Sequence, residues 1–323
     1  MRAGARRVMT AAFESVGDGI FAIDADYVRP RLAASHLLTA GRRAAFIDVG
    51  TNHSAPNLLA ALASCQLAAD DVEHIILTHV HLDHAGGAGQ LARLLPRARV
   101  WVHPRGAAHL VDPAKLIAGT IAVYGAQRYA ELYGKIEPIA KERISTVEDG
   151  QRLSFGDRTL EFIYTPGHAL HHVCIADRDA HVVFTGDTFG LSYREFDGAA
   201  GEFALPTTTP TQFDPEQLLR SIDLVMQLRP RAAYLTHYSR VTSIERLGAD
   251  LKADIVAFVA IAREAARSPE RVARIKAAMF DYLSDRLDRH GYRGDERLRH
   301  QLLDGDIELN AAGLDAWLSR TAP

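Results

Sequence analysis

The distribution of apolar and polar positions separates a strand-rich N-terminal part of the chain from a helix-rich C-terminal part. Between residues 20 and 49, short apolar runs at 20–23 and 44–47 alternate with turn-forming residues, which predicts antiparallel strands. Residues 56–67 carry apolar side chains at helical spacing, and the apolar run 75–77 that follows completes a β-α-β unit. Short apolar segments predict further strands at 99–103, 159–164, 173–176, 181–185 and 232–236.

Helical patterns dominate one internal insertion and the C-terminal part of the chain. Residues 105–140 have a helical pattern without a single clean apolar face, and we expect this insertion to form a wall or lid. Asp214, Pro215 and Gln217 predict a helix start, because an Asp cap followed by proline at the first helical position stabilises the first turn. The sequence therefore predicts an α/β catalytic domain at 1–245 and a C-terminal helical subdomain at 246–323.

Size and charge narrow the class of partner. The 323 residues suffice for one large core with an appended subdomain, and the formal net charge of -3 provides no positive surface for nucleic acid or an anionic membrane. A small-molecule substrate is therefore expected. Cys65 and Cys174 lie far apart, which argues against a disulfide framework. Without a transmembrane-length apolar run or the apolar core of a signal peptide, we expect a cytoplasmic protein.

The chemistry is concentrated directly after the apolar run 75–77. Three histidines and a carboxylate occur within six residues, at His79, His81, Asp83 and His84. Imidazoles and carboxylates crowded so closely need a shared cation to offset their loss of hydration. A ligand set of nitrogen and oxygen donors without thiolates suits zinc, iron or manganese, and favours a catalytic over a structural site. We expect the following Gly86 and Gly87 to let the chain turn tightly beside the metal.

Three more candidate ligands follow short apolar strands. They are His168, Asp187 and His237, and Asp48 stands in a similar place after the predicted strand 44–47. Side chains at neighbouring strand ends converge on one edge of a sheet, which is the usual place for a site in layered α/β proteins. The repeated placement predicts a single cavity with several metal ligands.

These motifs, in this order, resemble those of the metallo-β-lactamase-fold superfamily, in particular its glyoxalase II and lactonase-like branch. The resemblance covers about residues 15–240 and implies a four-layer αβ/βα sandwich, here with a C-terminal helical extension. It implies two sets of ligands, one for each of two divalent ions: His79, His81 and His168, and Asp83, His84 and His237. It further implies that Asp187 bridges both ions and that Asp48 orients ligand imidazoles without binding metal.

The implied activity is a binuclear metallo-hydrolase. Two divalent ions, with zinc favoured over iron or manganese, lower the pKa of a water held between them, so that a bridging hydroxide is available near neutral pH to attack a carbonyl. The expected substrate is a lactone, a thioester or a related ester-like small molecule. Asp187 and Asp83 are the expected catalytic carboxylates. Asp83 additionally has a secondary role in moving a proton to the leaving group.

The competing function is oxidative. Some members of the superfamily hold a single iron and oxidise persulfides, but the complete second ligand set gives that alternative no support. The lactonase comparison is weakened because Thr188-Phe189-Gly190 follows Asp187, whereas lactonases place a tyrosine there and this chain has Tyr193 later. No basic patch for glutathione stands out in the C-terminal helices. A homodimer is a possible partner arrangement.

Several neighbouring residues keep two interpretations. For His171 and His172, supporting hydrogen bonds are favoured over metal ligation. Tyr238 has either a hydrogen-bonding role toward an oxyanion or a packing role. The insertion at 105–140 and the aromatic loop at 189–213 either cover the metal cavity or build a dimer interface. The aromatic residues of that loop form a substrate wall or pack in the core: Phe189, Tyr193, Phe196, Phe203 and Phe213.

Overall fold

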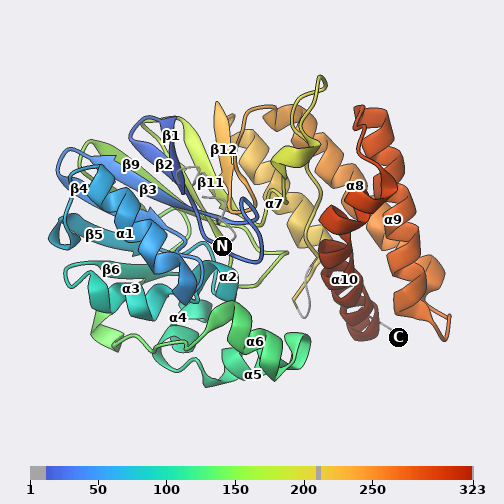
Figure 1. Cartoon of the computed structure of the whole chain (residues 1–323), viewed down its shortest axis with the longest axis horizontal. Coiled ribbons are helices and arrows are strands. Elements are labelled where there is room, and N and C mark those ends of the chain that lie inside the picture. The colour runs from blue at the N-terminus through green and yellow to red at the C-terminus, as the bar shows by residue number, and fades with distance from the viewer. Residues whose placement is uncertain (1–11, 209–211, 322–323) are drawn as a thin grey trace, which may run out of the picture.

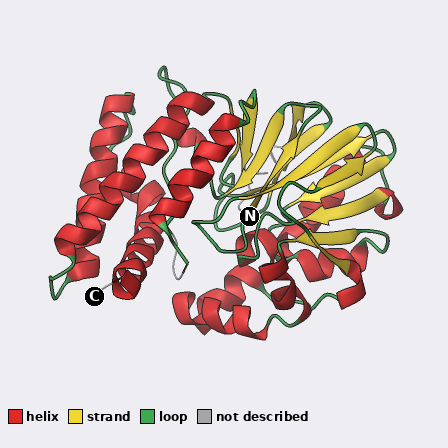
Figure 2. Ribbon diagram, turned by 180° about the vertical axis from the view of Figure 1, so that it is seen from behind, coloured by secondary structure: helices red, strands yellow, loops and turns green. Residues whose placement is uncertain are grey.

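The computed structural model describes residues 12–208 and 212–321. In this part of the chain, two β-sheets face each other and helices cover their outer faces, as Figures 1 and 2 show. This arrangement is the predicted α/β sandwich of four layers, with additional helices at the C-terminal end. None of the helices in the described ranges is long and apolar enough to cross a membrane.

The first sheet has seven strands that pair in chain order. Its first four strands are antiparallel neighbours, and its last four run parallel, so β4 to β7 all point the same way. The strands are β1 (Phe13–Gly17), β2 (Ile20–Asp24), β3 (Ala34–Ala40), β4 (Arg43–Ile47), β5 (Val72–Ile76), β6 (Arg99–Val102) and β7 (Ile144–Thr146).

The second sheet has six strands in the order β13-β12-β11-β10-β9-β8. Strand β10 is antiparallel to both β9 and β11, and β11 is parallel to β12, so β9, β11 and β12 share one direction. The strands are β8 (Arg152–Phe155), β9 (Arg158–Tyr164), β10 (Val173–Asp177), β11 (Val182–Gly186), β12 (Ala232–Leu235) and β13 (Ser239–Val241).

Side chains along the strands of the first sheet point alternately to its two faces, and they form one apolar core on each face. Ile47 and Ile76 face the second sheet and pack in a cluster with its Phe162, whereas their neighbours Phe46 and Ile75 face the outer helices. Successive strand residues point to opposite faces, so a strand buried on both faces is apolar throughout. The outer helices of this side are α1 (Ala55–Ser64), α3 (Ala88–Leu94) and α4 (Pro104–Val111), with the short α2 (Leu82–Ala85) beside the sheet edge.

The insertion predicted at 105–140 contains α4 and a helical hairpin. The hairpin consists of α5 (Ala114–Tyr124) and α6 (Ala126–Tyr133). Helix α4 packs on the first sheet through Leu110, whereas α6 buries tyrosines against the loop that follows β2. Only part of the predicted insertion is therefore available to cover a site.

One large apolar cluster joins the second sheet to all the C-terminal helices. It contains Ile222 of α7, Phe258 of α8, Met279 of α9 and Leu314 of α10 together with Val183 of β11. The helical subdomain predicted at 246–323 therefore shares its apolar core with the sheet. Its helices, and α7 before them, are α7 (Pro215–Gln227), α8 (Ile244–Ala265), α9 (Arg271–His290) and α10 (Glu296–Thr321).

Two local predictions have different outcomes. The cap of α7 is confirmed, because the Asp214 carboxylate accepts a hydrogen bond from the Gln217 backbone N–H at 3.0 Å, and Pro215 is the first helical residue. The turn expected at Gly86 and Gly87 is present between α2 and α3, but both residues have right-handed backbone angles, so the turn does not depend on the positive φ that glycine permits. They are needed for close packing instead, since a Cβ on Gly87 would lie 2.6 Å from the Thr51 carbonyl oxygen.

Candidate metal centre

The candidate ligands lie where the ends of parallel strands from both sheets meet. In the first sheet, β4 leads to Asp48 and β5 leads to the His79 segment. In the second sheet, the three strands that share a direction lead to His168, Asp187 and His237. The parallel direction places all these residues at one edge of the sandwich, as the sequence predicted.

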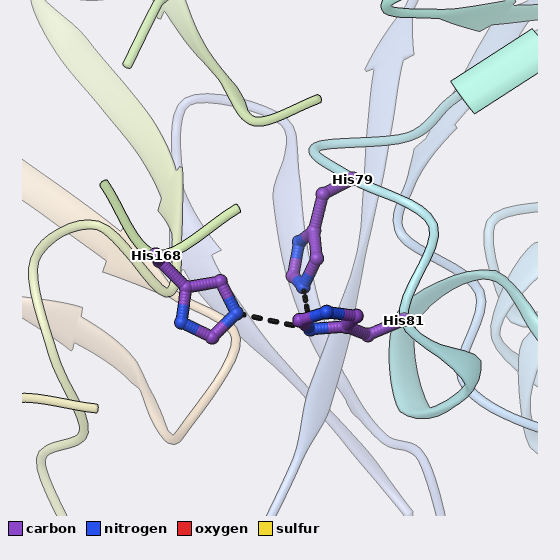
Figure 3. A group of neighbouring side chains, drawn as sticks. All are labelled: His79, His81 and His168. Carbon is purple, nitrogen blue, oxygen red and sulfur yellow. Dashed lines mark hydrogen bonds between the residues drawn. The ribbon is translucent and has the colours of Figure 1, made fainter. Parts of the chain in front are cut away.

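His79, His81 and His168 form one group. The His79 Nε2 atom lies 2.9 Å from His81 Nδ1, and the His168 Nε2 atom lies 3.0 Å from the same His81 nitrogen. Figure 3 shows the three rings meeting at their nitrogen edges, although His168 comes from a different segment than His79 and His81. His79 and His168 are at most 1% exposed, whereas His81 is partly exposed.

Asp83, His84 and His237 form a second group, and their ligand atoms lie within 4.8 Å of one another. The Asp83 Oδ2 atom is 3.4 Å from His237 Nε2 and 3.6 Å from His84 Nε2. The side chain of Asp83 is 20% exposed, whereas that of His84 is fully buried. Asp83 is therefore the member of this group that solvent reaches most easily.

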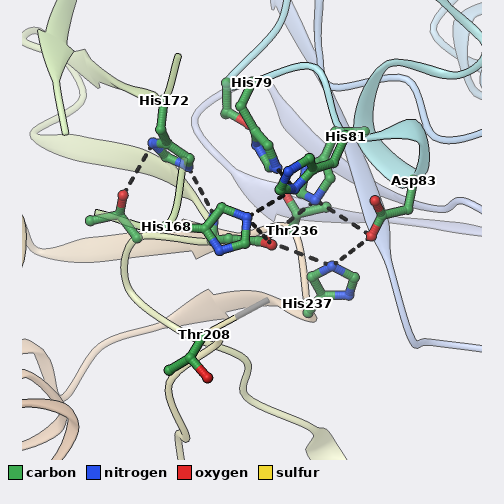
Figure 4. A network of polar contacts seen from close by, with 12 residues as sticks. His79, His81, Asp83, His168, His172, Thr208, Thr236 and His237 are labelled. Atoms are coloured by element: carbon green, nitrogen blue, oxygen red, sulfur yellow. Dashed lines mark hydrogen bonds and ion pairs between the residues drawn. The ribbon is translucent and has the colours of Figure 1, made fainter. Parts of the chain in front are cut away.

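Asp187 lies between the two groups and directs one oxygen to each. Its Oδ2 atom is 3.4 Å from His168 Nε2. Its Oδ1 atom is 3.3 Å from His84 Nε2 and 3.7 Å from His237 Nε2. Figure 4 shows the two groups and the contacts between them. The structure thus brings all seven sequence-predicted ligands to one place, with Asp187 central.

Asp48 supports the site through hydrogen bonds to three neighbouring segments. Its Oδ1 atom accepts from the Thr78 backbone N–H at 2.8 Å. Its Oδ2 atom accepts from the Thr236 hydroxyl at 2.9 Å and lies 2.8 Å from His84 Nδ1. These bonds fix the ring of His84 so that its other nitrogen faces Asp187, which is the orienting role that the resemblance implied.

His172 also supports the site through hydrogen bonds. Its Nε2 atom accepts from the Asp187 backbone N–H at 3.2 Å, and its Nδ1 atom lies 2.9 Å from the Thr165 hydroxyl and 3.1 Å from the Thr188 hydroxyl. Because both ring nitrogens are engaged, neither is free for a metal. The Nδ1 atom of His171 accepts from the Val80 backbone N–H at 3.5 Å, and its ring packs against that of His79 with centroids 6.1 Å apart. The favoured interpretation of His172 is confirmed.

Burial keeps the first group in the neutral form. Burial, followed by the charges of neighbouring histidines, places the pKa of His79 well below its usual value. Burial and then His168 lower the pKa of His81 to about 3. A neutral imidazole has a lone pair available to a metal, whereas a protonated imidazole has none. These rings are therefore in the ligand form near neutral pH.

In the second group, Asp83, His84 and His237, the charges of neighbouring residues outweigh the effect of burial on the pKa values. Burial opposes ionisation of Asp83, but the positive charges of His84 and His237 outweigh it and lower the pKa of Asp83 to about 2. For His84, burial lowers the pKa, but Asp187, Asp83 and Asp48 together outweigh burial and raise it well above its usual value. This end of the site therefore gathers three carboxylates around His84 and favours a positive charge among them.

The residues present fit a pair of cations. The His84 Nε2 and Asp187 Oδ1 atoms are buried, and neither has a hydrogen-bond partner among the described residues. His81 Nδ1 faces two imidazole nitrogens at once, yet a ring nitrogen carries only one proton or one lone pair. A cation in each group would satisfy these atoms, because buried ligand atoms without partners are costly.

The aromatic residues after Asp187 pack in the core. Phe189 and Phe203 are at most 1% exposed and belong to the cluster that joins the second sheet to the C-terminal helices, as do Phe196 and Phe213. The Tyr193 hydroxyl donates to Asp306 of α10 at 2.8 Å. Tyr238 is buried beneath the guanidinium of Arg31, which lies 4.9 Å from its ring centroid. The packing interpretation therefore describes these residues better than a substrate wall does.

Several supporting contacts have no signal in the sequence. The Nδ1 atom of His237 lies 2.9 Å from the Leu32 carbonyl oxygen, and the Tyr27 and Tyr133 hydroxyls lie 2.8 Å apart. The Leu32 carbonyl is a backbone group, so no residue type in the sequence indicates this contact. The tyrosine pair joins the loop after β2 to the insertion, and the negative charge of Asp83 contributes, after burial, to a raised pKa of Tyr27.

Residues 28–237 match the metallo-beta-lactamase superfamily, a range that includes every candidate ligand. The chain belongs to this superfamily. The resemblance predicted from the motif order is thereby confirmed.

Relatives in this superfamily carry different names. A metallo-beta-lactamase fold-containing protein of Sulfurisphaera tokodaii is 28% identical over 224 residues, which are 68% of this chain and 78% of that protein. An atrochrysone carboxyl ACP thioesterase of Aspergillus fumigatus is 24% identical over 66% of this chain and 52% of its own length. An acyl-coenzyme A thioesterase of Homo sapiens is 26% identical over 54% of this chain and 65% of its own length. The matches to the two thioesterases thus span less than two thirds of those proteins.

Solved structures of the superfamily share the fold over most of the chain. An archaeal superfamily protein from Sulfolobus tokodaii has a TM-score of 0.65 and 22% identity, and the superposition covers 92% of this chain and 98% of that one. A metallo-beta-lactamase family protein from Thermus thermophilus has a TM-score of 0.67 and 20% identity, with 95% of each chain covered. The coverage extends beyond residue 237, so the shared fold includes C-terminal helices.

Proposed function

We propose that this chain is a binuclear metallo-hydrolase that cleaves an ester-like carbonyl compound, with thioesters and lactones as the candidate substrates. The observation that carries the proposal is the position of Asp187, which directs one oxygen to each of two histidine-containing groups. The family match and the thioesterase names of the human and fungal relatives support a metal-dependent hydrolase. Thioesters are therefore the first substrates to test.

The proposed ligand sets follow the geometry. His79, His81 and His168 would hold one ion, Asp83, His84 and His237 would hold the other, and Asp187 would contact both. When bound, two divalent ions supply a water with lowered pKa and a positive charge that polarises a carbonyl. Zinc is the proposed metal, since imidazole and carboxylate ligands without thiolate suit a catalytic zinc site, with iron and manganese as alternatives.

Side chains of the protein orient the proposed metal ligands and transfer the proton. Asp48 and His172 hold His84 and Asp187 in place through the hydrogen bonds described above. Asp83 is the partly exposed carboxylate of the site, so it can accept a proton from water and pass it to a leaving group. Its low pKa, about 2, makes it a weak base, and its contribution to the rate is therefore secondary to that of Asp187.

A substrate panel combined with metal analysis tests the proposal. Protein purified without added metal would be assayed with short and long acyl thioesters and with lactones, and its metal content measured in the same preparation. We expect hydrolysis of at least one of these classes together with two ions per chain. A single iron per chain, with oxygen consumed when a persulfide is added and no hydrolysis, would instead support the oxidative alternative.

A further inference from the structure

Helix α10 directs two polar side chains at segments that lead to the metal centre: Asp306 accepts from Tyr193, and Asn310 bonds to the loop at 206–208. Its buried residues include Leu303, Ile307 and Leu314, which pack in the cluster that joins the helices to the second sheet. Asp306 and Asn310 are four residues apart and so lie on the same side of the helix. Asn310 is only 1% exposed, and burial of an amide is unfavourable unless its hydrogen bonds are made.

Asn310 makes these bonds to the loop that precedes α7. Its side-chain oxygen accepts from the Thr208 backbone N–H at 2.6 Å, and its side-chain nitrogen donates to the Pro206 carbonyl oxygen at 3.0 Å. The Thr208 hydroxyl in turn donates to the Asn310 carbonyl oxygen at 3.0 Å. One side chain therefore fixes the backbone on both sides of Thr207, which itself is only 3% exposed.

Thr207 contacts a proposed metal ligand directly. Its backbone carbonyl accepts a hydrogen bond from the His168 ring. The Nε2 atom of that ring faces His81 Nδ1 and the Asp187 carboxylate, so we assign the bond to Thr207 to the other ring nitrogen. Figure 4 draws Thr208 on the loop near His168. A hydrogen bond at the second nitrogen fixes the orientation and the tautomer of a metal-binding imidazole.

We propose that Asn310 is a positioning residue for His168, and that the C-terminal helix thereby sets the affinity of the three-histidine site for its metal. The connection runs from the Asn310 amide through the 206–208 backbone to the ring of His168. An apolar residue could not make these bonds, so the buried amide is explained by the loop that it holds. The inference rests on the proposed function, because it requires His168 to be a ligand.

Zinc titration of three variants tests the proposal. Asn310→Leu keeps the helix but removes the side-chain bonds to the loop. His168→Ala removes the ligand, and Leu303→Ala disturbs the same helix without removing a polar group. Each metal-free protein would be equilibrated with buffered Zn²⁺, and the ions bound per chain measured. We expect Asn310→Leu to need about 10 to 100-fold more free Zn²⁺ for one of two ions, the scale at which loss of an orienting partner weakens metal sites.

The control variants separate the possible outcomes. The affected ion should be the one that His168→Ala loses, and Leu303→Ala should lower Tm without changing either affinity. If Asn310→Leu binds both ions as the unchanged protein does while His168→Ala loses one, the positioning role is wrong. If His168→Ala keeps both ions, the proposed metal centre itself is wrong.

A milder variant keeps the test decisive if Asn310→Leu does not fold. Thr208→Val removes only the hydroxyl bonds to Asn310 and leaves the backbone bond in place. The expected result is a smaller loss of affinity for the same ion. In a protein that folds with both substitutions, the double variant should lose at least as much affinity for that ion as Asn310→Leu alone, because the Thr208 hydroxyl also donates to the Asn310 backbone carbonyl, which leucine keeps. Unchanged affinity in Thr208→Val, with Asn310→Leu unfolded, would contradict the proposal.

Discussion

Asp187 and Asp48 show how two buried carboxylates in one site acquire different tasks. Asp48 is surrounded by donors from Thr78, Thr236 and His84, so its lone pairs are occupied. Asp187 has an Oδ1 atom without a hydrogen-bond partner among the described residues and lies beside imidazole nitrogens. An acceptor that is already satisfied orients its neighbours, whereas an unsatisfied one is available to a cation.

Replacement of the proposed bridging carboxylate should separate activity from stability. Asp187→Ala is expected to lower kcat/KM about 100-fold or more, because a group that positions the charge acting on the transition state is lost. The metal-free variant should melt within about 3 °C of the metal-free parent, since the packing of the two sheets is unchanged. Activity assays and thermal melting check this together. Survival of both metal content and turnover would show that Asp187 does not bridge.

His36 provides a test of stability against pH. Burial lowers the pKa of this β3 residue to about 4, despite the opposing charge of Asp48, whereas a histidine in an unfolded chain has a pKa near 6.5. The unfolded state therefore binds a proton more readily, so stability is complete above pH 6.5 and falls as the pH decreases to about 4. The difference between the folded and unfolded pKa values corresponds to about 3 kcal/mol of unfolding free energy.

The matching variant is His36→Phe, which keeps an aromatic ring between Phe184 and Tyr234. Denaturant unfolding of both chelator-treated proteins at pH 7 and pH 4.5 would measure the effect. The parent should lose more stability than the variant over this interval, by about the amount given above. Equal losses in the two proteins would mean that His36 takes up its proton in the folded state as well.

The residue types in the sequence predicted the proposed metal ligands, but not most of the groups that hold those ligands in place through hydrogen bonds. Histidines and aspartates follow several apolar strands in turn, and their order along the chain matched a superfamily, so the seven ligands could be named from the sequence. The supports of His237 and His168 are backbone carbonyls of Leu32 and Thr207, which every residue possesses. Their positions depend on how distant segments pack, and no local pattern encodes that packing.

At the scale of elements, the strand-to-helix connections decide where the ligands stand. The loop from β9 to His168 passes so close to α7 that Gly167, at a φ of +131°, has no room for a side chain beside the Leu218 backbone. The Gly167 carbonyl also accepts from the Asp214 N–H at 2.8 Å, next to the cap of α7. Helix α7 and the proposed ligand are therefore placed by the same contact.

A methyl group at this contact should disturb the site as well as the helix. Gly167→Ala requires an unfavourable backbone angle and meets the backbone of α7, so we expect lower Tm and loss of the ion bound by His168. Gly198→Ala is the matched control, because a Cβ there meets nothing within 4 Å. Thermal melting and metal analysis of both variants check this. A Gly167→Ala protein with normal Tm and full metal content would contradict the close contact.

The loop after Asp187 should govern stability rather than substrate choice. Phe189 is fully buried in the apolar cluster that reaches α8, so Phe189→Ala is expected to cost about 3 to 5 kcal/mol of unfolding free energy. The ratio of kcat/KM values for short and long acyl substrates should stay the same. Denaturant unfolding and the substrate panel measure the two quantities. If the variant instead prefers a different acyl chain length and is as stable as the parent, the interpretation of Phe189 as part of a substrate wall would be supported.

Long apolar runs made most strands and helices predictable, and short exposed elements were missed. Strands such as β10 and β11 are buried along their whole length and have clear apolar segments. Strands β1 and β7 have no fully buried residue and are held by pairing with a neighbour, so they lack a distinct apolar pattern. Edge strands of this kind are defined by their hydrogen bonds rather than by burial.

At the scale of the whole molecule, the two sheets hold the ligands and the C-terminal helices close the second sheet. The four layers were implied by the resemblance, and the architecture bears this out. The single core shared by β11 and α7 to α10 was not foreseen, since composition alone marked a change near residue 245. Apolar side chains on separate segments join one core only when the fold brings them together.

The most direct test of a binuclear hydrolase is a titration of hydrolytic turnover with metal. Protein stripped by a chelator would receive Zn²⁺ in increasing equivalents, and turnover of its best thioester or lactone substrate would be measured at each step. We predict no activity without metal and a rise that reaches its plateau at two equivalents per chain, because two groups of ligands share Asp187. Full turnover without metal, or a plateau at one equivalent, would contradict a binuclear mechanism.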